Sequence, residues 1–318
     1  MNRIPIPGTD LQLSPICLGT GSFGSAISLD ESFRLLDTYA ELGGNFLDTA
    51  HVYAAWLPNG AGASERTIGA WMKARGVREK TIVGTKGAHP HLDSMHVPRM
   101  SRAEIVSDLN ESLERLQANF VDLYWLHRDA PAVPVGEILG ILNELIAEKR
   151  IGAIGCSNWT PRRQRDAAEY ARKNTVTGFC ASQIGFSLAK SPQEVGYGDT
   201  LFMADGSMQF HRESGTPLMA YSSQANGFFS GKYTRATPRD KGVMAAYGTN
   251  ENVARLERAQ GLAQRLNRSA NQIALGYVLS QSFPSVAIVG SRTVEQVTDS
   301  CRAADLRLSA ADLKFLEG

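Results

Sequence analysis

The chain has 318 residues, of which 43% are hydrophobic and 20% are charged, and its formal net charge is +1. This profile predicts a globular α/β protein and argues against binding to nucleic acid or to an anionic membrane surface. No apolar run approaches the roughly 20 residues of a membrane helix, and the first residues lack the apolar core of a signal peptide. We therefore expect one cytoplasmic domain over residues 1–318, with Cys17, Cys156, Cys180 and Cys301 as buried free thiols.

Short strands and amphipathic helices alternate along the whole chain. Residues 3–14 predict a hairpin, and eight apolar runs then predict buried parallel strands at 16–20, 45–49, 81–86, 121–127, 151–157, 179–183, 217–222 and 285–290. Helical spacing and capping residues predict helices over 28–42, from Ser64, after Ser101, and over 135–150, 160–174, 252–267, 270–281 and 293–303. Eight strands, each followed by a helix, predict a (β/α)₈ barrel with a hairpin before it and extra loops at its C-terminal face.

The stretch ICLGTGSFG, residues 16–24, has the G-x-G-x-x-G spacing of a dinucleotide-binding Rossmann fold. In that fold the helix begins within the glycine motif, whereas here the next helix cap is Ser28. A second element of the Rossmann fingerprint is also missing. We therefore interpret the stretch as the first barrel strand and its loop, where the backbone of Gly19, Thr20 and Gly21 can approach a cofactor.

Four polar side chains fall at the ends of three successive predicted strands. Asp48 ends the second strand, Tyr53 lies in the loop after it, Lys86 ends the third strand and His127 ends the fourth. Parallel strands lie about 4.8 Å apart and end at one barrel face, so these side chains can converge. Each residue alone would be explained as a cap, a loop anchor or a solvated strand end. The four together indicate one site.

These four groups are suited to proton transfer to a carbonyl oxygen. A phenol is a weak acid near neutral pH, and we expect the Lys86 ammonium to lower the pKa of Tyr53 towards the working range. Asp48 supplies the anion that Lys86 needs, and His127 can donate a hydrogen bond to the carbonyl oxygen. None of these side chains can deliver a hydride, so a cofactor must.

The motifs FLDTAHVY, GTK, VDLYWLH and IGAIGCSN resemble those of the aldo-keto reductases, and the resemblance runs from LGTGSFG to IVGSR. It implies a (β/α)₈ barrel that binds an extended nicotinamide cofactor, usually NADP(H), without a Rossmann domain. It also implies a catalytic tetrad of Asp48, Tyr53, Lys86 and His127, in which Tyr53 is the general acid.

The resemblance further assigns the cofactor contacts, including one from Asp48. Ser157, Asn158 and Gln183 match the residues that bind the nicotinamide carboxamide, and Tyr221 matches the aromatic residue that stacks on the ring. Ser222 and Gln224 fall in the pyrophosphate region, which departs from the usual family pattern.

The adenosine end of the cofactor is assigned to residues of the segment IVGSRTVEQVTDS, namely Gly290, Ser291, Arg292, Gln296, Asp299 and Ser300. Ser291 and Arg292 suit a 2′-phosphate, because a guanidinium forms charge-assisted bonds with phosphate. Gln296 stands where some family members have arginine, and Asp299 and Ser300 replace a common Glu-Asn pair. We therefore expect NADP(H), with NAD(H) as the alternative.

Long loops are expected around the substrate pocket, with Tyr53, Trp56 and His127 as the substrate-binding residues. Trp56 either stacks on the substrate or anchors its loop to the barrel. His89, His91 and His96 are interpreted as pocket-lining or solvated residues, because no carboxylate spacing supports a metal site. Loop 187–212 is expected to border the pocket.

The leading hypothesis is an NADP(H)-dependent oxidoreductase that interconverts a small carbonyl compound, weakly favouring a sugar-derived one, and its alcohol. The alternative is a nucleotide-sensing regulatory subunit with little turnover, since members of this family can act as partners of membrane proteins. The sequence does not distinguish a monomer from a homo-oligomer.

Overall fold

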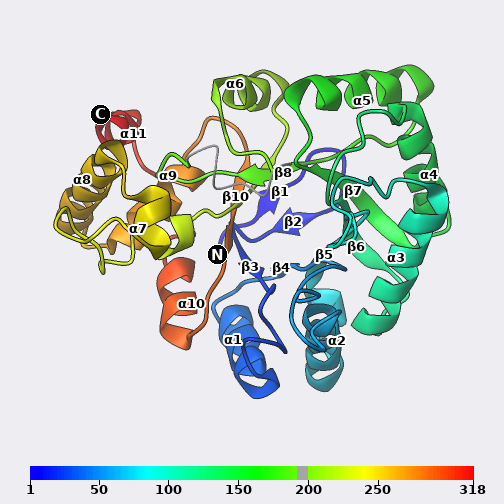
Figure 1. The fold of residues 1–318 in the computed structure, drawn as a ribbon, viewed down its shortest axis with the longest axis horizontal. Coiled ribbons are helices and arrows are strands. Elements are labelled where there is room, and N and C mark those ends of the chain that lie inside the picture. The colour runs from blue at the N-terminus through cyan, green and yellow to red at the C-terminus, as the bar shows by residue number, and fades with distance from the viewer. Residues whose placement is uncertain (192–199) are drawn as a thin grey trace.

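A computed structural model describes residues 1–191 and 200–318, and eight parallel strands form a closed barrel at its centre (Figure 1). Around the barrel the strands follow the order β10-β3-β4-β5-β6-β7-β8-β9. Their bounds are β3 (Ile16–Gly19), β4 (Phe46–Asp48), β5 (Ile82–Gly87), β6 (Val121–Leu126), β7 (Ile151–Ser157), β8 (Ser182–Gly185), β9 (Leu218–Tyr221) and β10 (Ser285–Val289). The closed parallel sheet confirms the predicted (β/α)₈ barrel and rules out the open sheet of a Rossmann fold.

Helices surround this barrel as an outer ring (Figure 1). Their bounds are α1 (Leu29–Glu41), α2 (Ala63–Arg75), α3 (Arg102–Leu116), α4 (Val135–Ala147), α5 (Pro161–Asn174), α6 (Asp205–Ser214), α7 (Gly242–Tyr247), α8 (Asn250–Leu266), α9 (Ala270–Leu279), α10 (Val294–Cys301) and α11 (Ala310–Glu317). Within the described residues, none of these helices is long and apolar enough to cross a membrane.

The predicted hairpin is present as β1 (Ile4–Pro5) and β2 (Gln12–Leu13), which pair antiparallel. Ile6 and Leu13 are buried with apolar side chains of the barrel interior, among them Phe46 and Trp125. The hairpin therefore covers the end of the barrel opposite the C-terminal ends of the strands.

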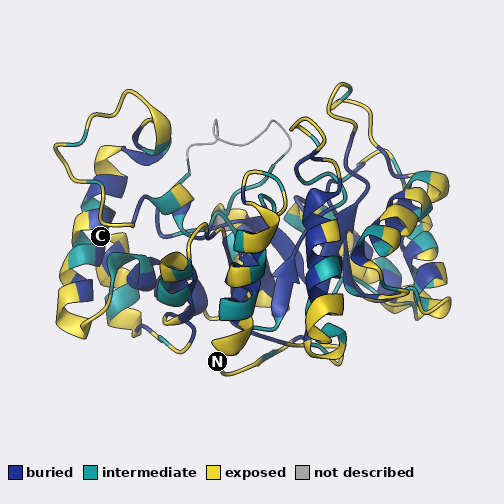
Figure 2. Ribbon diagram, turned by 90° about the horizontal axis from the view of Figure 1, so that it is seen from below, coloured by how far each residue is buried: buried dark blue, intermediate teal, exposed yellow. Residues whose placement is uncertain are grey.

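Two apolar layers hold the barrel together. The inner cluster fills the barrel, and a larger outer cluster lies between the strands and the helices. Figure 2 shows the resulting pattern, with buried strands in the middle and helices whose outward faces are exposed. Because apolar side chains fill the barrel, polar groups that end the strands are held at its mouth.

Local capping explains most of the helix starts. The Ser28 side chain accepts a hydrogen bond from Glu31 N, and Ser101 forms a capping box with Glu104. The predicted start of the second helix at Ser64 is wrong by one residue, because α2 begins at Ala63 after a left-handed glycine. Ser64 and Glu65 instead form tertiary hydrogen bonds, so their polar groups are not used as a cap.

One strand is shifted from its predicted position. The run 179–183 is apolar, but β8 occupies Ser182–Gly185, where Ser182 pairs with both Cys156 and Leu218. Gln183 is therefore the second residue of this strand and not its last. Cys180 precedes the strand and is partly exposed, in contrast to the predicted burial of all four thiols, although all four are free.

Candidate active site

Lys86, near the C-terminal end of β5, is the centre of a polar cluster at the barrel mouth. Its Nζ atom donates hydrogen bonds to Asp48 Oδ2 at 2.7 Å, to the Thr49 carbonyl at 2.8 Å and to the Tyr53 hydroxyl at 2.9 Å. The side chain is only 1% exposed, and these three acceptors match the three N–H groups of an ammonium. The ammonium is therefore held in one position by its full set of partners.

Asp48, at the end of β4, balances this buried charge. Its Oδ2 atom also accepts a hydrogen bond from the Tyr53 hydroxyl at 3.2 Å, and its Oδ1 atom accepts one from Gln183 Nε2 at 2.9 Å. β4 and β8 lie on opposite sides of the closed barrel, so the bond to Gln183 crosses its interior. The sequence prediction missed this contact, because the two residues are 135 positions apart.

Burial dominates the acidity of the Tyr53 hydroxyl. It raises the pKa of Tyr53 to about 12, with Lys86 acting to lower the pKa and Asp48 acting to raise it. The predicted effect of Lys86 thus has the right sign, but the expected net decrease is wrong. Burial alone would lower the pKa of Lys86, and Asp48 and Tyr53 together outweigh burial and raise it. At neutral pH the site therefore holds a protonated phenol beside a charged ammonium.

The His127 ring follows β6 and lies beside these groups. It packs edge-on against the Tyr53 ring, with 6.0 Å between centroids, and against the His89 ring, with 4.8 Å. Burial, followed by the charge of Lys86 and other nearby groups, lowers the pKa of His127 well below its ordinary value. A neutral imidazole can still donate one hydrogen bond. Its Nδ1 atom is buried and has no hydrogen-bond partner in the described part of the chain.

The residues assigned to the nicotinamide carboxamide lie together at the C-terminal end of β7, just after it and on β8. Ser157 Oγ donates to the Gln183 carbonyl at 3.0 Å, and Asn158 Nδ2 donates to Ser157 Oγ at 3.1 Å and to the His127 carbonyl at 3.3 Å. The Tyr221 hydroxyl is 2.9 Å from Asn158 Oδ1. The structure thus joins all four predicted contacts into one polar group beside the tetrad.

Tyr221, at the end of β9, also contacts loop 187–212. Its hydroxyl donates to the Leu201 carbonyl at 2.9 Å, and the Phe202 ring packs edge-on at 5.7 Å from the Tyr221 ring. Residues 192–199 of this loop lie outside the described residues. Leu201 and Phe202 therefore lie beside Tyr221, whereas the predicted loop is helical from Asp205 onward, in α6.

Asp299 and Ser300, assigned to the adenosine end, form a second network with Gln224 from the predicted pyrophosphate region. Gln224 Nε2 donates to Ser300 Oγ at 3.1 Å and to Asn271 Oδ1 at 3.0 Å, and Asn271 Nδ2 donates to Asp299 Oδ2 at 2.7 Å. Asp299 accepts two further hydrogen bonds at the start of α9. A cofactor contact from Asp299 would have to compete with these bonds. Asn271 belongs to this network and was not predicted.

Next to this network, after β10, lies a group that fits a phosphate. The Ser291 hydroxyl is buried and without a partner among the residues described, whereas the Arg292 side chain and Gly290 are exposed. Gln296 Oε1 accepts a hydrogen bond from Arg292 N at 2.8 Å and so fixes the backbone of this turn. The Ser291 hydroxyl and the Arg292 guanidinium are both hydrogen-bond donors that suit an anion. Ser222, from the predicted pyrophosphate region, is only partly buried and has a positive φ of 52°.

The glycine stretch has a different role from the one its spacing suggests. Gly24 has a φ of +64°, and a Cβ there would lie 2.2 Å from Thr67 Oγ1, so glycine is required for packing on α2. Thr20 is buried, and its hydroxyl donates to the backbone of β4. Gly21 is the glycine of this stretch that lies beside Tyr53, because a Cβ there would lie 3.6 Å from the Tyr53 ring.

Trp56 and the clustered histidines occupy different environments. Trp56 is 59% exposed, so the interpretation of its ring as a loop anchor is wrong, and substrate contact stays a prediction. His91 and His96 are exposed, whereas His89 is buried against His127. In the described ranges, no group of three or more His, Cys, Asp or Glu side chains is placed to hold a metal ion.

Comparisons with known proteins agree with this architecture. The chain is 29% identical over 313 residues to the uncharacterized oxidoreductase YrpG of Bacillus subtilis. This match covers 97% of this chain and 92% of YrpG. It is 27% identical to norsolorinic acid reductase A of Aspergillus parasiticus over 99% of this chain and 80% of that protein. A crystal structure of the thermostable aldo-keto reductase Tm1743 shares the fold, with a TM-score of 0.75 and 23% identity over 100% of this chain and 99% of that one. The model of the Aldo/keto reductase family matches residues 15–318, and the chain belongs to this family.

Proposed function

We propose that this protein is an NADP(H)-dependent oxidoreductase that reduces a small carbonyl compound to its alcohol and catalyses the reverse reaction. One observation carries the proposal: the Lys86 ammonium is bonded to both Asp48 and the Tyr53 hydroxyl, beside a buried neutral His127. This arrangement provides a positioned proton donor and a fixed positive charge at one point of the barrel mouth. Both are needed where negative charge develops on a carbonyl oxygen.

In this proposal the nicotinamide cofactor supplies the hydride, and side chains of the protein supply the proton. Tyr53 donates its hydroxyl proton to the carbonyl oxygen, and Lys86 stabilises the resulting phenolate at 2.9 Å. Asp48 keeps Lys86 charged and in position, while the His127 ring donates a hydrogen bond that orients the carbonyl. Ser157, together with its neighbours on β7 and β8, would hold the carboxamide of the cofactor.

The direct test is a substrate screen in which the loss of NADPH absorbance is followed at neutral pH. The panel should include sugar-derived aldehydes and ketones and also aromatic carbonyls, since relatives carry names such as norsolorinic acid reductase and aryl-alcohol dehydrogenase. Turnover of any of these compounds, lost on substitution of Tyr53, supports the proposal. Nucleotide binding with turnover at background would contradict it and favour the nucleotide-sensing subunit.

The proposal includes a cytoplasmic location, which the four free cysteines support.

The preference for NADP(H) rests on Ser291 and Arg292. We expect Arg292→Ala to raise KM for NADPH about tenfold or more and to leave KM for NADH within about twofold, because a charge-assisted bond is lost only with the 2′-phosphate. Arg302→Ala removes an exposed positive charge at the other end of α10 and is the matched control. Equal KM values of the two cofactors in the wild type, unchanged in Arg292→Ala, would contradict the preference.

The two pKa shifts predict different pH dependences for the two reaction directions. The pKa of Tyr53 is about 12 and that of His127 lies well below its ordinary value, so neither group changes charge between about pH 7 and 9. The reductive kcat/KM is expected to stay constant over this range, because the acid remains protonated. Oxidation needs the ionised phenol, so its kcat/KM should rise about tenfold per pH unit. A reductive rate that falls steadily across this range would contradict the assignment.

A further inference from the structure

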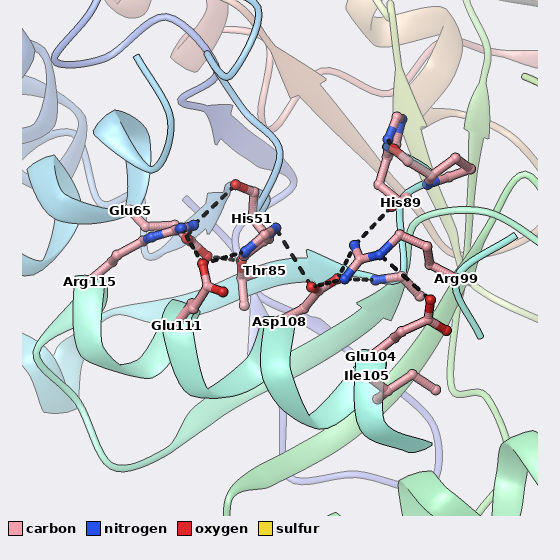
Figure 3. Close-up of polar contacts among 12 residues, drawn as sticks. His51, Glu65, Thr85, His89, Arg99, Glu104, Ile105, Asp108, Glu111 and Arg115 are labelled. Atoms are coloured by element: carbon pink, nitrogen blue, oxygen red, sulfur yellow. Dashed lines mark hydrogen bonds and ion pairs between the residues drawn. The ribbon is translucent and has the colours of Figure 1, made fainter. Parts of the chain in front are cut away.

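A chain of polar contacts joins α3 to the loop that carries Tyr53 and to the turn after β5 that carries His89 (Figure 3). Asp108, Glu111 and Arg115 have the spacing i, i+3 and i+7 and therefore lie on one face of α3. Figure 3 shows this face turned towards His51 on one side and towards Arg99 on the other. Asp108 stands where the two sets of contacts meet.

On the first side, Asp108 holds the turn after β5. Its Oδ2 atom accepts hydrogen bonds from Ala88 N at 2.9 Å and from Arg99 Nη1 at 3.0 Å, and its Oδ1 atom accepts one from Arg99 Nη2 at 2.6 Å. Arg99 Nη1 also donates to the His89 carbonyl at 3.0 Å. Ala88 has a φ of +59°, a left-handed conformation that a residue other than glycine adopts at a cost. The hydrogen bond that Asp108 accepts from Ala88 N and the one that Arg99 donates to the His89 carbonyl keep the turn in this conformation.

The turn places the His89 ring against His127. Their ring centroids are 4.8 Å apart with an interplanar angle of 65°, and both side chains are buried. His127 Nδ1 has no hydrogen-bond partner among the residues that the structure covers. The orientation of the His127 ring is therefore set on this side by its packing on His89 and not by a hydrogen bond to Nδ1.

On the second side, α3 holds the loop that leads to Tyr53. The His51 Nδ1 atom is 4.0 Å from Asp108 Oδ1, and His51 Nε2 is 3.0 Å from Glu111 Oε2. Arg115 Nη1 donates to the His51 carbonyl at 3.2 Å. His51 is two residues before Tyr53, so its position limits where the phenol can lie.

From these contacts we propose that Asp108 is a positioning residue, which holds the His89 turn against His127 and, with Glu111 and Arg115, the His51 loop that carries Tyr53. The inference rests on the proposed function, because it concerns the geometry of the same tetrad. Asp108 touches neither substrate nor cofactor in this scheme, and its effect is transmitted through His89 and His51.

The chain offers a matched control at the opposite end of the barrel. Asp122, in β6, accepts a hydrogen bond from Val83 N at 2.9 Å and forms an ion pair with Arg78 at 3.0 Å. Like Asp108, it is a largely buried carboxylate that binds one backbone N–H and one arginine. It differs in lying at the N-terminal ends of the strands, far from the tetrad.

The test compares Asp108→Asn with Asp122→Asn. Both variants are expected to lower the thermal midpoint, Asp108→Asn by the larger amount, because its ion pair with Arg99 is more deeply buried than that of Asp122 with Arg78. Asp108→Asn should lower kcat about 10- to 100-fold, since small displacements of reacting groups have effects of this size, with the NADPH Kd within about twofold of wild type. Asp122→Asn should keep kcat within about twofold. Equal kcat values for Asp108→Asn and the wild type, or an equal loss in both variants, would overturn the inference.

Two further measurements cover the remaining outcomes. If Asp108→Asn does not fold, Arg99→Lys keeps the positive charge but loses the paired bonds, and it should lower kcat in the same way. NMR signals of the imidazole nitrogens report the positions of His127 and His51 without any turnover, and they should shift in Asp108→Asn but not in Asp122→Asn. Unshifted signals would overturn the positioning role. A wild type that reduces no carbonyl compound would instead contradict the proposed function, and the NMR comparison would still decide the inference.

Discussion

Replacement of Tyr53 by phenylalanine is expected to lower kcat for carbonyl reduction by about 10²- to 10⁴-fold, the range typical of a lost general acid. The phenylalanine ring fills the same space, so the packing on His127 at 6.0 Å and on Gly21 is retained. Lys86 loses one of its three acceptors but keeps Asp48 and the Thr49 carbonyl. The NADPH Kd, measured by the fluorescence of the nucleotide, should therefore change little.

The control for this substitution is Tyr170→Phe, which removes a phenol on the outer helix α5 and should leave kcat unchanged. Loss of the hydroxyl also removes the donor to Asp48 Oδ2 at 3.2 Å, so the stability of Tyr53→Phe should be measured alongside its activity. A Tyr53→Phe variant that keeps wild-type kcat would show that another group, or water, supplies the proton.

The barrel could be predicted from the sequence because its strands are apolar on both faces and its helices carry local caps. β7 has the predicted bounds, 151–157, and β6 ends one residue before the prediction. β8 was misplaced because its register is set by pairing with β7 and β9, and the apolar character of 179–183 gives no information on that pairing.

The clustering of Asp48, Lys86 and His127 could be predicted, because they fall at the ends of successive strands and neighbouring parallel strands bring their ends together. Tyr53 joins them from the loop after β4. The bond between Gln183 and Asp48 could not, because it depends on closure of the barrel between strands far apart in the sequence. The pKa of Tyr53 was predicted in the wrong direction for a related reason. The charge of Lys86 is visible in the sequence, whereas the degree of burial, which dominates, is set by the whole barrel mouth.

The contacts of α3 were also invisible at the level of sequence. Asp108, Glu111 and Arg115 are charged residues at helical spacing, a pattern typical of a solvated helix face. In the structure the Asp108 side chain is 2% exposed and Arg115 17%, because the loops after β4 and β5 fold over this face. Loop conformations of this kind follow from tertiary contacts and not from local propensity.

The buried pair of Lys86 and Asp48 leads to the second large expected effect. Lys86→Met removes the cation and leaves the Asp48 carboxylate, which is 2% exposed, with Gln183 and Tyr53 as its remaining side-chain partners among the described residues. Breaking a buried ion pair on one side costs about 3–5 kcal/mol of the free energy of unfolding, which denaturant unfolding would measure. The loss of positive charge also removes the stabilisation of the Tyr53 phenolate, so kcat should fall by about 10²-fold or more.

The double variant Asp48→Asn/Lys86→Met separates these two consequences of the same substitution. With both charges of the Lys86–Asp48 pair removed, most of the lost stability should return, because a neutral pair avoids the desolvation of a lone carboxylate. Activity should not return, because neither methionine nor asparagine supplies the positive charge that stabilises the phenolate of Tyr53. If the double variant recovers kcat together with stability, Lys86 acts on the fold alone and not on the chemistry. If Lys86→Met is as stable as the wild type, the pair of Lys86 and Asp48 contributes nothing net to the free energy of unfolding.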